Sequence, residues 1–141
     1  MLVVEDNAAS RGVVVRFLGQ RLRRAGVVGV GSSAEARAAI WSGVRGIVVD
    51  VQLPDGDGLR LVDDIRAAAP YAHVLLITGR GDAWIANRAA ELNALLARKP
   101  DLVGPLRGFA QRVAAASAGH VHAGAGALHG AISEVAVDVL A

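Results

Sequence analysis

Five residues able to take part in chemistry each follow a short apolar run. They are Glu5, Asp6, Asp50, Thr78 and Lys99. If folding brings the three carboxylates together they repel, because two like charges about 4 Å apart cost roughly 4 kcal/mol at an effective dielectric of 20. Either one carboxylate then binds a proton or a cation lies among them. Carboxylate oxygens suit Mg²⁺, which is also bound by water and phosphate oxygens.

Lys99 is the one lysine among fifteen basic residues. A compact ammonium pairs with a carboxylate or a phosphoryl oxygen as a point charge. The hydroxyl of Thr78 can donate a hydrogen bond to a phosphoryl oxygen. Phosphoryl transfer requires positioning and charge neutralisation more than covalent chemistry by the protein. These residue types therefore suit that reaction if the fold brings them together.

Positioning these residues requires a strand before each of them. Strands are predicted at residues 2–4, 27–30, 46–49, 74–77 and 94–97, and helices at 7–25, 32–42, 58–69, 82–93 and 101–116. Apolar strands that alternate with amphipathic helices indicate a parallel sheet covered on both faces, an α/β fold. Such sheets bind ligands at the carboxyl ends of their strands. The five residues are therefore expected at one edge of the sheet.

Local signals support these boundaries. Asn7 can cap the first helix, which Gly26 is expected to end. Ser32 and Glu35 have the spacing of a capping box. The segment PDGDG, residues 54–58, predicts a tight turn directly after the strand that ends at Asp50.

Four segments of the chain, LVVEDN, IVVDVQLPDGDGL, LLITGR and ARKP, occur in this order over about residues 1–115. Together they resemble a receiver domain of the bacterial two-component response regulators, similar to a chemotaxis regulator. The resemblance implies a flavodoxin-like (βα)5 fold, a doubly wound parallel sheet with strand order 2-1-3-4-5. The predicted receiver domain spans residues 1–116, and residues 117–141 form a flexible tail rich in Ala, Gly and His.

The resemblance also implies roles for individual residues. Asp50 resembles the aspartate that accepts a phosphoryl group from the phosphohistidine of a sensor histidine kinase or a phosphotransfer protein. Glu5, Asp6, Asp50 and the backbone carbonyl of Gln52 resemble the ligands of Mg²⁺. Such a chain is a phosphoacceptor and not an enzyme, although it can promote its own phosphorylation and dephosphorylation.

Thr78 and Lys99 resemble the hydroxyl and the lysine that contact the phosphoryl oxygens and start a switch. Two positions depart from the family pattern. Leu96 stands three residues before the lysine, where the family usually has an aromatic residue. Asn93 stands where a glycine is frequent, and asparagine also tolerates a left-handed backbone.

The resemblance implies that helix 82–93, strand 94–97 and helix 101–116 form a switching face, with Trp84, Leu96 and Arg107 on it. This face is expected to bind a downstream protein or a second copy of the chain. Residues 117–141 are too few for a DNA-binding domain, so direct DNA binding is not expected. The chain could be a single-domain regulator, a phosphorelay shuttle or a fragment of a longer protein.

Two other functions are compatible with parts of this pattern. A pseudo-receiver would use the same fold to bind partners without phosphorylation, and Leu96 is its main support. An aspartyl-phosphate phosphatase of the haloacid dehalogenase type would need a second aspartate where Gln52 stands. Histidines 120, 122 and 129 could bind a metal, but in a flexible tail this is disfavoured.

The composition excludes several other classes. The chain has 141 residues, 53% of them hydrophobic, with a formal net charge of +2 and no cysteine. This is typical of one globular domain without disulfides and fits a cytoplasmic protein. The N-terminal segment lacks the features of a secretory signal, and no apolar run approaches the length of a membrane span.

Overall fold

The computed structural model describes residues 1–39 and 43–123 and is built around a five-stranded parallel sheet. The strands are β1 (Leu2–Val4), β2 (Val28–Val30), β3 (Gly46–Asp50), β6 (His73–Thr78) and β7 (Leu95–Arg98). Their spatial order is β2-β1-β3-β6-β7, which corresponds to the predicted order 2-1-3-4-5. The predicted α/β flavodoxin-like fold is confirmed.

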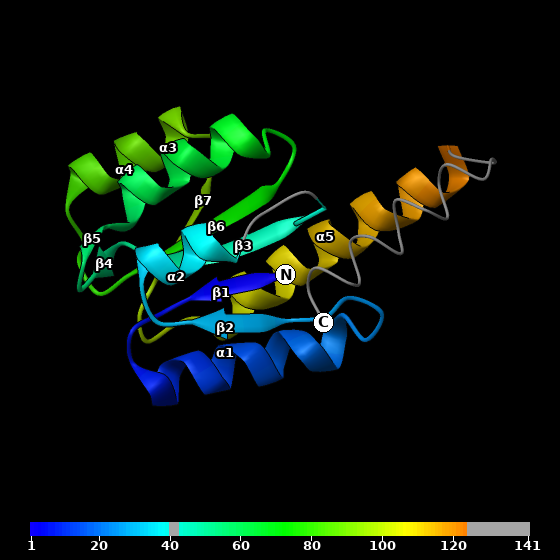
Figure 1. The fold of residues 1–141 in the computed structure, drawn as a ribbon, viewed down its shortest axis with the longest axis horizontal. Coiled ribbons are helices and arrows are strands. Elements are labelled where there is room, and N and C mark those ends of the chain that lie inside the picture. The colour runs from blue at the N-terminus through cyan, green and yellow to red at the C-terminus, as the bar shows by residue number, and fades with distance from the viewer. Residues whose placement is uncertain (40–42, 124–141) are drawn as a thin grey trace.

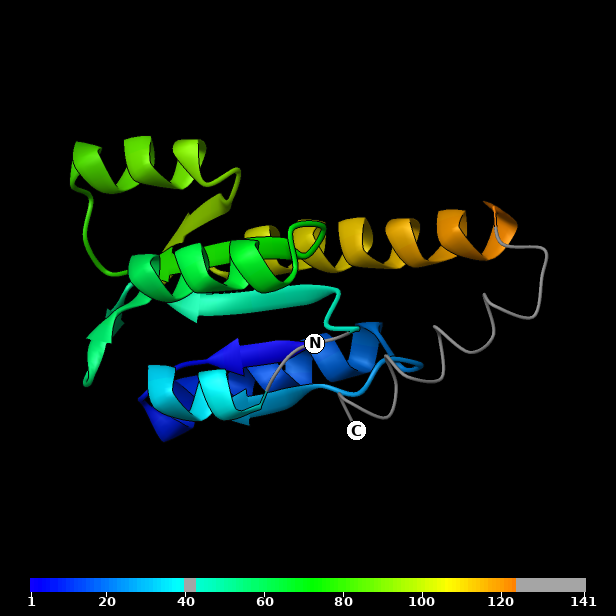
Figure 2. The same ribbon diagram turned by 45° about the horizontal axis from the view of Figure 1, so that its top comes forward.

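Five helices cover the two faces of this sheet (Figure 1). They are α1 (Ala8–Arg21), α2 (Ser33–Ala38), α3 (Gly58–Ala68), α4 (Ala83–Glu91) and α5 (Val103–Ala123). Helices α1 and α5 contact each other on one face, and α2 and α3 lie on the other, as Figure 2 also shows from a second direction. Among the described residues, no helix is long and apolar enough to cross a membrane.

The predicted apolar stripes face the sheet. Buried members of these stripes are Val14, Leu18 and Leu22 of the first, Leu61, Val62 and Ile65 of the third, and Leu106, Phe109, Ala110 and Val113 of the last. Phe17 is only partly buried, and the guanidinium of Arg21 lies 3.6 Å from its ring centre. Apolar side chains therefore pack against both faces of the sheet, and loops lie at the ends of its strands.

The predicted helix caps form, with one difference. Asn7 Oδ1 accepts a hydrogen bond from Ser10 N at 2.9 Å, and Ser32 Oγ accepts one from Glu35 N at 3.1 Å. The Glu35 carboxylate accepts from Gly31 N instead of from Ser32 N, so the capping box closes one residue earlier. Side-chain oxygens thus satisfy free backbone donors at both helix starts.

Several element ends differ from the prediction. Helix α1 ends at Arg21 and not near Ala25, because the buried Leu22 leaves the helical conformation, with φ −116° and ψ 56°. Helix α5 extends to Ala123, beyond the predicted end near residue 116. The predicted end of the second helix and the tail after Ala123 lie outside the described residues.

The segment after Asp50 is more ordered than the predicted turn. It forms a short antiparallel hairpin of β4 (Gln52–Leu53) and β5 (Gly56–Asp57). Asp57 Oδ1 then caps α3 by accepting from Leu59 N at 2.8 Å. A Cβ at Gly58 would overlap the Asp50 carbonyl oxygen and lie 3.0 Å from Val51 Cα. Only glycine lets α3 begin this close to the end of β3.

We expect Gly58→Ala to destabilise the protein by about 1–3 kcal/mol, because the added methyl group overlaps backbone that cannot move aside easily. Gly19→Ala is the matched control, since a Cβ there meets nothing within 4 Å. This second change should stabilise α1 by up to about 1 kcal/mol. Urea unfolding of both variants measures the difference. Equal effects of the two changes would contradict the close approach at Gly58.

Candidate functional site

The pairing of β1 with β3 brings two carboxylates to the same edge of the sheet. Val4 pairs with Val49, so the next residues, Glu5 and Asp50, are neighbours. Glu5 is fully buried and Asp50 is 4% exposed. Two acids at this depth require a partner, because an isolated buried charge is costly.

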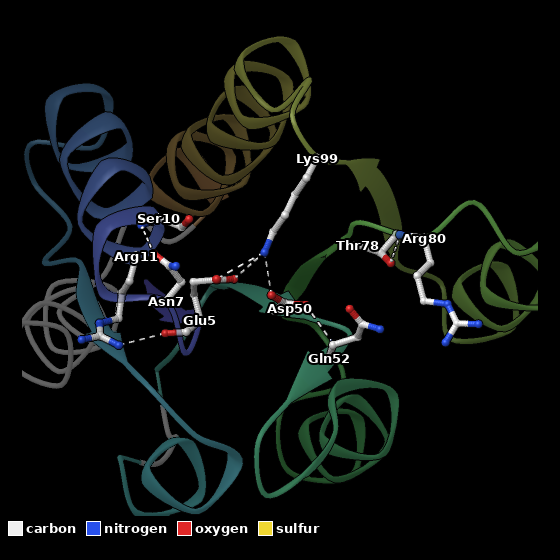
Figure 3. A network of polar contacts seen from close by, with 9 residues as sticks. All are labelled: Glu5, Asn7, Ser10, Arg11, Asp50, Gln52, Thr78, Arg80 and Lys99. Carbon is white, nitrogen blue, oxygen red and sulfur yellow. Dashed lines mark hydrogen bonds and ion pairs between the residues drawn. The ribbon is translucent and has the colours of Figure 1, made fainter.

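Lys99 is that partner (Figure 3). Its Nζ lies 2.8 Å from Asp50 Oδ2 and 3.2 Å from each carboxylate oxygen of Glu5. The backbone positions it, since Lys99 N donates to Thr78 O at 2.8 Å directly after β7. The peptide bond between Lys99 and Pro100 is cis. The sequence prediction that these three residues converge is confirmed.

Asp6 completes a cluster of three acids. One carboxylate oxygen from each of Glu5, Asp6 and Asp50 lies within 4.8 Å of the others. Asp6 is exposed, so the cluster opens to solvent on one side. A single ammonium leaves the three carboxylates incompletely neutralised, and their hard oxygen atoms suit Mg²⁺. The cluster is therefore able to hold a divalent cation.

Backbone contacts orient the Asp50 carboxylate. Gln52 N donates to its Oδ1 at 2.8 Å, while Lys99 contacts its Oδ2. The two oxygens are thus engaged from different sides. Gln52 itself is exposed next to the site, and Val51 N donates to Ile77 O at 2.9 Å, which ties the chain after Asp50 to β6.

The electrostatics of the cluster affect Glu5 most. Burial, together with the hydrogen bond and the charge of Asp50, raises the pKa of Glu5 to about 7, although Lys99 acts in the opposite direction. Burial lowers the pKa of Lys99, but the two carboxylates outweigh this and the net shift is upward. Near neutral pH and without a cation, Glu5 therefore holds a proton part of the time. Both ways of relieving the repulsion, a proton or a cation, are available to this site.

Thr78 lies at the same edge of the sheet but is directed elsewhere. Its buried Oγ1 accepts a hydrogen bond from Arg80 N at 3.0 Å. Among the described residues, no hydrogen bond joins the Thr78 hydroxyl to Asp50 or Lys99. The structure therefore places Thr78 near the site as predicted but not in contact with the ion pair.

The sequence did not reveal two contacts around the site. The Asp55 carboxylate accepts from Ser33 N, Ser33 Oγ and Ala34 N at 2.8–3.0 Å, which ties the hairpin to the start of α2. These hydrogen bonds, those of the Ser33 and Ala34 backbone first, lower the pKa of Asp55 to about 2. The guanidinium of Arg98 lies against Gly81 in the loop after β6. Neither contact has a local signal in the sequence, because each depends on tertiary packing.

Comparison with known proteins assigns this arrangement to a family. Residues 1–97 match the family model of the response regulator receiver domain. The chain belongs to this family, the receiver domains of two-component systems. The acidic cluster and the lysine lie on the segments that carried the resemblance.

Individual relatives support the assignment. Protein PetR of Rhodobacter capsulatus is 36% identical over 86 residues, which cover 58% of this chain and 34% of PetR. The chain thus spans about a third of that relative's length. The receiver domain of HemR from Leptospira biflexa is 25% identical, with a TM-score of 0.71 over 79% of this chain and 90% of that domain.

A third relative was solved in a modified state. It is a response regulator from Burkholderia pseudomallei with a phosphorylated aspartic acid, a calcium ion and citrate. It is 27% identical to this chain, with a TM-score of 0.65 over 83% of this chain and 71% of that protein.

The raised pKa of Glu5 predicts a pH-dependent stability in the absence of divalent cations. The pKa of about 7 lies above the ordinary value of 4.5, so the folded state holds this proton more tightly than the unfolded state. The resulting stabilisation is complete below the unfolded pKa and is lost as the pH rises through the folded pKa. Relative to Glu5→Gln, which does not titrate, the wild-type protein should lose up to about 3 kcal/mol between about pH 5 and about pH 8.

Urea unfolding in EDTA at a series of pH values measures this difference. Parallel pH profiles for the wild-type protein and Glu5→Gln would show that Glu5 is ionised alike in the folded and unfolded states. That result would contradict the effect of burial at this position.

Proposed function

We propose that this receiver domain accepts a phosphoryl group on Asp50 from the phosphohistidine of a sensor histidine kinase or a phosphotransfer protein. The observation that carries the proposal is the contact of Lys99 with both Asp50 and Glu5 beside the exposed Asp6. The phosphorylated aspartic acid in the Burkholderia pseudomallei relative supports it. The proposed switch changes the binding of a protein partner or of a second copy of the chain.

In the proposed reaction, a carboxylate oxygen of Asp50 attacks the phosphorus atom of the phosphohistidine. A P–O bond forms, the P–N bond breaks, and the imidazole nitrogen leaves with the electron pair. The product is an acyl phosphate on Asp50. Lys99 stays within reach of the new phosphoryl oxygens and neutralises part of their charge.

The metal in this proposal is Mg²⁺, held by Glu5, Asp6, Asp50 and the backbone carbonyl of Gln52. The carboxylates fit this group because their oxygens converge within 4.8 Å and one of them is open to solvent. Bound Mg²⁺ supplies charge neutralisation to the transferring phosphoryl group. A cation held there would also favour the ionised form of Glu5, whose pKa is raised by burial and by Asp50.

The proposed switch begins at Thr78. Phosphorylation adds between one and two negative charges and new acceptor oxygens. The Thr78 hydroxyl then rotates to donate to a phosphoryl oxygen and leaves the N–H of Arg80. The loop between β6 and α4 shifts as a result, and with it the proposed partner face of α4, β7 and α5, on which Trp84 is 53% exposed.

Phosphorylation is tested with the purified chain in Mg²⁺ and acetyl phosphate or beryllofluoride. We expect saturable Mg²⁺ binding and a phosphoryl-dependent change in tryptophan fluorescence and amide NMR signals. The isosteric control Asp50→Asn should lose the phosphoryl-dependent change, because an amide does not attack phosphorus. No response to Mg²⁺ or to either phosphoryl reagent would leave a pseudo-receiver that signals by binding alone.

The switch is tested separately from the phosphoryl transfer. Thr78→Ala should still be phosphorylated, because Thr78 does not contact the Asp50 carboxylate, but the fluorescence change at Trp84 should be strongly reduced. Thr78→Ser keeps the hydroxyl and should retain the change. Trp84→Phe identifies the contribution of Trp84. Equal fluorescence changes in Thr78→Ala and Thr78→Ser would show that the Thr78 hydroxyl is not needed for the switch.

A further inference from the structure

A second candidate site lies at the opposite edge of the sheet, where β6 and β7 begin. A cavity of about 370 Å³ opens there, between the loops that lead into these strands and the side of α5. Its polar side chains belong to Arg66, Tyr71, His73, Asn93 and Arg112. Among the described residues that line it, none is acidic. Its volume falls in the range of small-molecule sites.

Arg66 forms a fixed wall of this cavity. Its guanidinium donates to the carbonyl oxygens of Pro70, Ala72, Leu92 and Asn93. These contacts use four of its five N–H donors and join the loop before β6 to the loop before β7. Carbonyl groups do not neutralise its charge, so Arg66 contributes a positive charge that is held in place.

Two more basic groups are close to that charge. Burial lowers the pKa of His73, and the charges of Arg112 and Arg66 lower it further. The three side chains line the same cavity, and the lowered pKa favours the neutral form of His73. Arg112 is exposed and forms no ion pair or hydrogen bond within the described part of the chain, so its guanidinium is available to a ligand.

The acids on the neighbouring helices are engaged elsewhere. Asp63 and Glu91 bind Arg88 at 2.9 and 3.0 Å, and Asp64 binds Arg37 at 2.7 Å. The cavity therefore keeps its positive character in the folded protein. A ligand that supplies negative charge would relieve the repulsion between the guanidinium groups of Arg66 and Arg112.

We propose that this cavity binds a small metabolite that carries a phosphate monoester. A phosphate monoester has nearly two negative charges at neutral pH. Arg112 binds its oxygens as a planar fork, and His73 donates from its ring. Tyr71, 65% exposed at the rim, offers an aromatic face to the organic part of the ligand. The volume exceeds that of a phosphate group alone, so we expect the whole metabolite to enter.

The test is an amide NMR titration of the full chain with AMP in EDTA, so that the acidic cluster holds no cation. We expect saturable shifts at residues 70–74 and 93–95. Adenosine, which lacks the phosphate, should cause none at the same concentration. Inorganic phosphate should compete with AMP but bind more weakly, because it lacks the organic part.

Two exposed arginines of α5 provide matched variants. Arg112→Gln should weaken AMP binding about tenfold, because it removes a charge-assisted hydrogen bond. Arg107→Gln changes the net charge equally but lies outside the cavity lining, so its affinity should match that of the wild-type protein. His73→Gln should also weaken binding and keeps a donor of similar size.

Three results would overturn the proposal and indicate an adventitious ion only. They are amide shifts that do not saturate with AMP, shifts spread over other arginines, and equal AMP affinity of Arg112→Gln and Arg107→Gln. The titration contains neither Mg²⁺ nor a phosphoryl donor, so Asp50 stays unphosphorylated throughout. The result is therefore independent of whether Asp50 accepts a phosphoryl group.

Discussion

The contact of the partly exposed Lys99 with the buried Asp50 and Glu5 connects the last strand of the sheet to its first and third strands. Asp50 lies 49 positions before Lys99 in the sequence, and Glu5 lies 94 positions before it. Removing Lys99 would leave two buried carboxylates without their cationic partner, which is unfavourable because buried charges require a partner. The neutralisation of charge is incomplete, since Asp6 adds a third carboxylate that the single ammonium does not neutralise. The same group of residues thus joins the carboxyl ends of three strands and favours the binding of a cation there.

The backbone around Asp50 fixes the position of its carboxylate in the cluster. Gln52 N holds one carboxylate oxygen, and α3 begins so close to β3 that only glycine fits at position 58. Asp55 ties the hairpin between these elements to α2. These contacts fix the backbone on both sides of Asp50 and so hold its carboxylate in place. The proposed switch requires such a fixed acceptor, because the added charge must appear at one defined place.

The residue pattern was sufficient to predict an α/β fold and the members of the cluster for a physical reason, whereas the strand order came from the family resemblance. Apolar runs with polar residues at their ends specify both the strands and their common edge, so Glu5, Asp50 and Lys99 could be placed together. Pattern alone could not separate the buried Glu5 from the exposed Asp6, nor show that the Thr78 hydroxyl binds Arg80 N. The early end of α1 and the hairpin after Asp50 also depend on tertiary contacts, which leave no periodic signal.

The two edges of the sheet have opposite electrostatic character, and the same strands connect them. β6 begins with His73 at the basic cavity and ends with Thr78 at the acidic cluster, and β7 likewise begins at the cavity and leads into Lys99. Arg66 joins the loops that precede both strands. A shift of β6 or β7 upon phosphorylation would therefore change the cavity as well. Coupling between two binding sites is reciprocal, so a ligand in the cavity would bias the proposed switch by the same free energy.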